Sequence, residues 1–127
     1  MNFKSKNDAI ISHCKKYRYV LWRNWDKSKQ SVMFIGLNPS KADIIQDDPT
    51  ICRCINFAKS WGYGGIIVTN LFAYRTKYPR ELKITKNPIG KDNDMWINKI
   101  SKEDVFKVAA WGNHGTYLNR SENILKS

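Results

Sequence analysis

Long apolar runs are missing from this sequence of 127 residues. No segment approaches the roughly 20 apolar residues that a membrane-spanning helix needs, so the pattern argues against a membrane protein. Residues 1–8 also lack the apolar core of a signal peptide. We therefore expect a cytoplasmic protein without a membrane partner.

Acidic residues are scarce: the sequence has 11 Asp and Glu against 22 Lys and Arg, a net charge of +11. Such an excess is typical of proteins that bind nucleic acid, because contacts with phosphates release counterions. A lysine-rich composition on every solvated face explains the same number equally well. The five Trp and six Tyr residues favour nucleic acid slightly, since aromatic rings among cations suit base stacking, although they also suit a core.

Cysteine is rare as well, and its spacing does not suit a metal site. Cys52 and Cys54 lie two positions apart on a predicted helix and so point to different faces, and Cys14 is remote in sequence. We expect structural thiols in a reducing compartment, no metal and no cofactor. A phosphate-cradling Gly-Lys-Ser/Thr loop is also absent, which argues against a nucleotide triphosphatase.

The length corresponds to a single domain over residues 1–127, with no internal repeat and no linker. A weak helical pattern covers residues 1–16, and an alternating aromatic run predicts a strand over 17–22. A polar turn leads to a second strand over 31–37. We expect these two strands to pair as an antiparallel hairpin at one edge of the sheet.

A helix is predicted to begin at Pro49, with Asp48 as its N-cap, and to end at Gly62. The strand over 65–69 follows, so this crossover makes the strands on either side of the helix parallel. A basic, irregular loop covers 70–91. A helix capped by Asp92 or Asn93, a strand over 105–110 and a short polar tail complete the chain.

The predicted architecture is therefore a three-layer α/β/α domain with a mostly parallel central sheet and an N-terminal antiparallel hairpin. Polar side chains follow three of its strands: Asn38, Asn70, and the pair Asn113 and His114. Ligands bind at the carboxyl ends of parallel strands, and amides can read the edge of a nucleobase. Ordinary turn residues are the alternative for the asparagines, and a surface loop residue for His114.

Other polar residues have weaker claims to a role. Of the carboxylates near the first helix, Asp48 is expected to cap it and Asp47 to offset basic surface, which leaves Asp43 for proton transfer. Ser40 has no histidine and acid at the spacing of a nucleophilic triad. The basic stretch after Asn70 suits phosphate contacts, with a solvated face as the alternative.

Five motifs in the chain resemble the domain-of-unknown-function family 1643, a bacterial and phage-borne family without an established activity. The similarity covers roughly residues 17–115 and is specific in order and spacing. The motifs are Gly-Leu-Asn-Pro-Ser-Lys-Ala-Asp at 36–43, Asp-Pro-Thr at 48–50 with Arg53, Trp-Gly-Tyr-Gly-Gly at 61–65, Asn-Leu-Phe-Ala at 70–73 and Ala-Trp-Gly at 110–112.

The order strand–Gly-x-Asn-Pro, strand–Thr-Asn, strand–Trp-Gly also resembles, more distantly, the uracil-DNA glycosylase superfamily. That resemblance implies a glycosylase-like fold in which Asn38 positions the attacking water and Asn70 reads the base. Phe72 is a nearby aromatic residue rather than a clean match to the stacking residue. Ser40 stands where the superfamily has Gly, and the His-Pro-Ser segment that stabilises the leaving base is absent, since His114 comes too early.

The sequence thus predicts a protein that recognises a nucleobase in DNA, with hydrolysis of the N-glycosidic bond left open. A non-catalytic nucleic-acid or nucleotide-binding module of phage or mobile-element origin is the alternative, and a protein–protein interaction domain is a third. The expected catalytic residues are Asn38 and Asp43. The expected base-binding residues are Gly36, Leu37, Pro39, Ser40, Asn70, Phe72, Trp111, Asn113 and His114. The expected phosphate-binding residues are Arg53, Arg75, Lys77 and Arg80.

Overall fold

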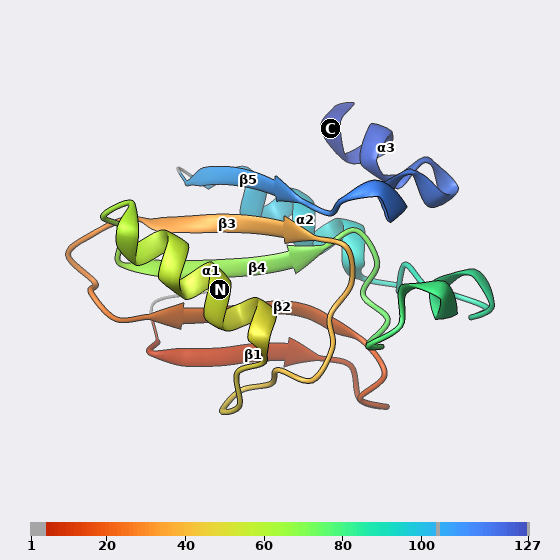
Figure 1. Ribbon diagram of the computed structural model, residues 1–127, viewed down its shortest axis with the longest axis horizontal. Coiled ribbons are helices and arrows are strands. Elements are labelled where there is room, and N and C mark those ends of the chain that lie inside the picture. The colour runs from red at the N-terminus through yellow and green to blue at the C-terminus, as the bar shows by residue number, and fades with distance from the viewer. Residues whose placement is uncertain (1–4, 104, 127) are drawn as a thin grey trace.

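The computed structural model describes residues 5–103 and 105–126, except for the side chains of Asn113, His114 and Lys126 (Figure 1). Five strands form one sheet in the order β1-β2-β4-β3-β5. Their bounds are β1 Asn7–Ile11, β2 Arg18–Asn24, β3 Ser31–Gly36, β4 Gly65–Asn70 and β5 Phe106–Ala110.

The sheet is mixed. β3 pairs in parallel with both β4 and β5, whereas β2 pairs antiparallel with both β1 and β4. The predicted parallel relation of the strands on either side of the first helix is therefore confirmed. A mostly parallel sheet is not, because the two pairings of β2 are as numerous as the two of β3.

The N-terminal antiparallel hairpin exists, but it consists of β1 and β2 and not of β2 and β3. The helix predicted over residues 1–16 is wrong for the part that the structure describes, since residues 7–11 form the edge strand β1; residues 1–4 lie outside the described residues. β2 is buried along nearly its whole length, which requires cover on both faces and a neighbour on both sides. The polar turn after β2 carries the chain past the position that β4 fills.

α1, Pro49–Ser60, connects β3 to β4 and begins as its sequence predicts. The Asp48 carboxylate accepts a hydrogen bond from the backbone N–H of Ile51 at 2.9 Å, and Pro49 occupies the first turn. Trp61 closes the helix, and Gly62 follows with a φ of 83°, a conformation that favours glycine.

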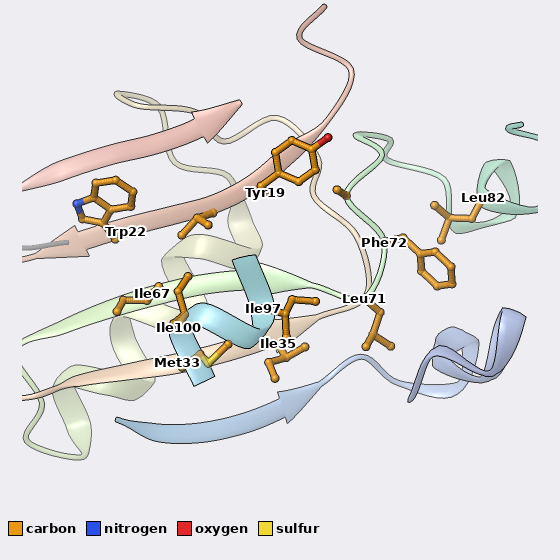
Figure 2. Close-up of a cluster of buried hydrophobic side chains, with 12 residues drawn as sticks. Tyr19, Trp22, Met33, Ile35, Ile67, Leu71, Phe72, Leu82, Ile97 and Ile100 are labelled. Carbon is orange, nitrogen blue, oxygen red and sulfur yellow. The ribbon is translucent and has the colours of Figure 1, made fainter. Parts of the chain in front are cut away.

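Two hydrophobic clusters, one on each face of the sheet, make the domain three-layered, as predicted. On one face α1 contributes Ile51, Cys54 and Ala58. On the other face α2, Asn93–Ser101, contributes Ile97 and Ile100 (Figure 2). In Figure 1, α1 lies in front of the sheet and α2 behind it.

The last segment is more structured than the predicted polar tail. A 3₁₀ segment, η2 Asn113–Asn119, leads into α3, Arg120–Lys126. A second 3₁₀ helix, η1 Pro79–Lys83, lies in the long basic loop after β4. No helix in the described part of the chain is long and apolar enough to cross a membrane.

Candidate functional site

A pocket of about 250 Å³ lies where β3, β4 and β5 end, with Gly36, Asn70 and Ala110 among its lining residues. The loop after β3 and the first two turns of α1 form its walls. The residues that line it are Arg18, Phe34, Gly36, Leu37, Asn38, Pro39, Ser40, Asp48, Thr50, Ile51, Arg53, Cys54, Val68, Asn70 and Ala110.

Many of the residues expected from the sequence meet in this pocket. They are Gly36, Leu37, Asn38, Pro39, Ser40, Arg53 and Asn70. The lining does not include Asp43, Phe72, Arg75, Lys77, Arg80 or Trp111. The side chains of Asn113 and His114, which were expected to bind the base, lie outside the described part of the structure.

Asn70 ends β4 and is almost completely enclosed, with 4% of its surface exposed. Its Oδ1 packs on Gly36: a Cβ added at Gly36 would lie only 2.6 Å from this oxygen. Its Nδ2 is buried without a hydrogen-bond partner among the described residues. The backbone below it is held by Asn93, whose Nδ2 donates to the Asn70 carbonyl at 2.8 Å.

Arg18, at the start of β2, is a pocket residue that the sequence analysis missed. It is 2% exposed, and its Nη1 donates to the carbonyl of Ala42 at 3.1 Å. Its Nε has no partner within the described residues. Burial lowers the pKa of this guanidinium to about 10, and the nearby charge of Asp48 opposes that shift. The available signal was a charged residue at the start of a strand, directly before the aromatic and aliphatic run at 19–22.

Asp48 is the one carboxylate in the pocket lining, and both of its oxygens already accept hydrogen bonds from backbone N–H groups. Oδ1 accepts from Ile51 at 2.9 Å and Oδ2 from Ala42 at 3.2 Å. The predicted role as a helix cap is confirmed. Its second contribution, negative charge beside Arg18, could not be inferred from the sequence.

Asn38 lines the pocket with its amide nitrogen already engaged. Nδ2 donates to the carbonyls of Thr76 at 2.7 Å and Pro39 at 3.0 Å, so the side chain joins the loops that follow β3 and β4. Its Oδ1 makes no hydrogen bond to any described residue. This oxygen is the atom that remains available to a water molecule.

Asp43 acts as a turn residue in this structure. Its Oδ1 accepts from the backbone N–H groups of Ile45 at 3.0 Å and Gln46 at 2.8 Å. These two bonds hold the pKa of the carboxyl below its usual value. The carboxylate therefore stabilises its own loop outside the pocket, which does not suit the expected transfer of a proton there.

The basic residues divide into structural and free groups. Arg75 donates to the carbonyls of Ser40, Lys15 and Lys41, so its guanidinium fastens loops together. The ammonium groups of Lys41 and Lys77 lie close enough that Lys77 lowers the pKa of Lys41. Exposed cations of this kind suit phosphate better than Arg75 does. Arg53 is exposed at the pocket, with Nη2 3.3 Å from the hydroxyl of Thr50.

The two expected aromatic site residues pack elsewhere. Phe72 is fully buried against Tyr117, with ring centroids 5.8 Å apart. Trp111 packs against the same hydrophobic cluster, on the α2 side of the sheet. In this arrangement neither ring reaches the pocket, because the chain turns away to that face after β4 and after β5.

The sequence model of a family described as a protein of unknown function (DUF1643) matches residues 18–127. The chain belongs to this family. The match begins at Arg18 and includes every residue that lines the pocket of this DUF1643 domain. Neither a curated protein nor a solved structure matches the sequence.

Two residues that line the pocket of this DUF1643 domain carry hydrogen-bond donors without a partner among the described residues. Asn70 Nδ2 and Arg18 Nε are both buried and unpaired in the described structure, and both residues line it. The described part of the chain contains no cluster of three or more His, Cys, Asp and Glu side chains able to hold a metal ion. The arrangement suits a small ligand that carries acceptor oxygens or nitrogens.

Proposed function

We propose that this DUF1643 protein recognises a nucleobase of DNA in the pocket at the ends of β3, β4 and β5. The observation that carries the proposal is the pair of unpaired buried donors, Asn70 Nδ2 and Arg18 Nε. Each such group costs about 1–3 kcal/mol when nothing accepts its hydrogen bond. The carbonyl oxygens and ring nitrogens along the edge of a base supply acceptors of this kind.

The size of the pocket supports a single base. Pockets for small molecules generally measure about 300–1,000 Å³, and this one, at about 250 Å³, lies just below that range. One base occupies such a space better than a dinucleotide does. Arg53 at the pocket and the net charge of +11 suit the phosphates attached to the base.

Hydrolysis of the N-glycosidic bond is the reaction we propose for this site, on a uracil-DNA-glycosylase-like fold. Asn38 Oδ1 is the group that would accept a hydrogen bond from the attacking water, since its Nδ2 is engaged by Thr76 and Pro39. Asp43 takes no part in this version of the mechanism, because its carboxylate is outside the pocket lining.

A non-catalytic nucleobase-binding module is the second candidate, and Asp48 favours it. Both oxygens of this carboxylate accept backbone hydrogen bonds, so the described pocket lining offers no unengaged carboxylate as a general base. Recognition by Asn70 and Arg18 is common to both candidates. The two differ only in what happens to the glycosidic bond.

Recognition is tested by calorimetric titration with uridine, thymidine, cytidine and inosine. The wild-type protein should bind at least one of them, and Asn70→Ala should bind it at least about tenfold more weakly, because one buried hydrogen bond is lost. Asn98→Ala, at an exposed position of α2, is the matched control and should bind normally. Equal binding by Asn70→Ala and wild type would disprove the assignment.

Chemistry is tested with labelled oligonucleotides that carry one uracil, hypoxanthine, mismatched thymine or hydroxymethylated pyrimidine, cleaved by alkali after incubation. Abasic product that disappears with Asn38→Ala supports hydrolysis at this site. Product that persists in that variant excludes the role of Asn38. Binding that depends on Asn70 without any product supports the non-catalytic module.

A further inference from the structure

A band of exposed aromatic rings runs along α1 to the edge strand β5. Phe57 is 51% exposed, Trp61 47% and Phe106 52%, large values for side chains of this size. The rings touch one another: Phe57 and Trp61 stack at 5.6 Å, and Trp61 meets Phe106 edge-on at 6.5 Å. A contiguous exposed apolar patch of this kind marks a binding surface, unlike apolar residues scattered singly.

The band is continuous with the pocket. Arg53, Phe57 and Trp61 are spaced four residues apart, so they lie along one side of α1, and Arg53 also lines the pocket. Trp61 stacks at 6.2 Å on Phe34, which is itself a pocket residue. A ligand that leaves the pocket past Arg53 therefore meets Phe57 and then Trp61.

The edge strand β5 leaves this side of the sheet open. β5 pairs with β3 alone in the described sheet, and its residues are mostly exposed. Figure 1 shows α1 crossing the other strands while β5 lies beyond it at the edge. Phe106 therefore forms the outer end of the band, supported by the ring of Tyr63 stacked on it at 6.0 Å.

We propose that this band, Phe57, Trp61 and Phe106, binds the single-stranded nucleic acid that flanks the base held in the pocket. This inference rests on the proposed function, and it names the form of the substrate. Exposed aromatic rings beside cations form the stacking platforms on which single strands bind without sequence preference. In a duplex the ring faces of the bases are covered by their neighbours, so a platform of this kind selects unpaired strands.

Charge argues for this occupant over a second copy of the chain. α1 contains Arg53 and Lys59 and no acidic residue, and the whole protein carries +11. A second copy would bring the same positive charge to the surface, whereas a phosphate backbone neutralises it.

The distance from the pocket to Trp61 sets how many bases lie along α1. Eight residues separate Arg53, at the pocket, from Trp61 in the band, so the path from the pocket along α1 to Trp61 is about 12 Å long at a rise of 1.5 Å per residue in an α-helix. At a spacing of about 3.4 Å this corresponds to roughly three stacked bases. An oligonucleotide of four nucleotides, one in the pocket and three on the band, should thus approach the full affinity.

The test is fluorescence anisotropy with labelled oligothymidylates of 2, 4 and 12 nucleotides, and with a duplex of the longest, at 50 mM salt. The single strands of 4 and 12 nucleotides should bind at least about tenfold tighter than the dinucleotide and the duplex. Phe57→Ala and Trp61→Ala should each weaken binding of the longer strands by about fivefold or more, the effect of one lost base–ring stack. Met95→Ala, at an exposed position on the opposite face, is the control and should bind normally.

Trp61 also provides a reporter of direct contact. Stacking of a base on its indole should quench part of the intrinsic fluorescence. In Trp61→Phe an aromatic ring stays at this position, but that part of the quenching should be lost. Quenching that is unchanged in Trp61→Phe would overturn the proposal, as would equal binding of duplex and single strand.

The two proposals fail separately. In one outcome, nucleoside binding depends on Asn70 but Phe57→Ala and Trp61→Ala bind oligonucleotides as wild type does. That result refutes the role of the band and leaves the nucleobase pocket supported. Such a result would point to a protein partner for the aromatic surface. Single-strand binding that depends on Phe57 and Trp61 but not on Asn70 supports the band and refutes the nucleobase pocket.

Discussion

Two buried arginines near the carboxyl ends of the strands are bonded very differently. Arg120, in α3, donates from Nε to the carbonyl of Leu71 at 2.9 Å and from both terminal nitrogens to the carboxylate of Asp94. The side chain of Arg18, in the pocket, makes one hydrogen bond in the described structure, to the carbonyl of Ala42, and its buried Nε has no partner there. Both side chains are almost fully enclosed.

This difference distinguishes a residue that stabilises the fold, Arg120, from one that is suited to bind a ligand, Arg18. Arg120 joins the loop after β4, α2 and α3, and its bonds satisfy most of its donors. Arg18 keeps a desolvated charge beside an incompletely bonded pocket, an arrangement that folding alone does not favour. A residue of this second kind is typical of a site whose remaining partner is a ligand.

The sharpest test of this comparison is to replace each arginine with methionine, which keeps much of the volume. Arg120→Met should lower the free energy of unfolding by about 2 kcal/mol, because it breaks a buried bidentate contact, although the exposure of Asp94 limits the loss. Arg18→Met should stay within about 1 kcal/mol of wild type, since it removes a poorly compensated buried charge. Urea unfolding followed by circular dichroism measures both.

Ligand binding should show the reverse order. Arg120→Met, measured under conditions where it is folded, should bind a nucleoside as wild type does, whereas Arg18→Met should lose at least about tenfold in affinity. The proposed difference is wrong if Arg18→Met unfolds as readily as Arg120→Met and binds the nucleoside as wild type does. Arg18 would then be a structural residue like its counterpart.

A smaller effect is expected where Asn70 rests on Gly36. A Cβ at Gly36 would lie 2.6 Å from Asn70 Oδ1, so Gly36→Ala should displace the amide and cost about 1 kcal/mol of stability. Nucleoside affinity should fall at least about tenfold. Gly62→Ala is the matched control: its positive φ predicts a similar loss of stability, but no described residue lies within 4 Å of the added Cβ, so binding should not change.

The parts of the fold that local sequence rules determine were predictable. Asp48 and Pro49 start α1, Gly62 ends it, and the length of this crossover makes β3 and β4 parallel. The convergence of Asn38 and Asn70 followed from that parallel pair, since Asn70 is the last residue of β4 and Asn38 lies just past the end of β3. Each of these inferences needs only neighbours in sequence and one topological rule.

What remained hidden depends on contacts between distant segments. The place of β2 beside β4 is set by burial on both of its faces, which an alternating pattern does not reveal. β1 is only five residues long and partly exposed, so its periodicity is too weak to distinguish strand from helix. Arg18 and Arg120 look like ordinary surface cations until the loops that enclose them are in place.

The smallest effect is expected at Cys54, which lines the pocket: its rate of alkylation depends on burial and on nearby charges, Arg18 among them, and is measured on the folded protein. Burial raises the pKa of this thiol to about 11, and so does the charge of Asp48, whereas the charges of Arg53 and, less strongly, Arg18 act in the opposite direction. At pH 8 only about one molecule in a thousand then carries the reactive thiolate. Exposed Cys14, whose pKa is lowered by the hydroxyl of Ser12, should therefore react with iodoacetamide at least about a hundredfold faster.

Peptide mass spectrometry after timed alkylation measures both rates in one sample. Raising the pH from 8 to 9 should speed Cys54 by about tenfold, since the thiolate fraction grows in proportion well below the pKa, and should speed Cys14 by less. Arg18→Met should slow Cys54 slightly because it removes one of the two cations, Arg53 and Arg18, that favour the thiolate, whereas Arg120→Met should leave the rate unchanged. Equal rates at Cys54 and Cys14 in the wild-type protein would show that the pocket is open to solvent. Arg18 would then not be desolvated, and the contrast with Arg120 would be wrong.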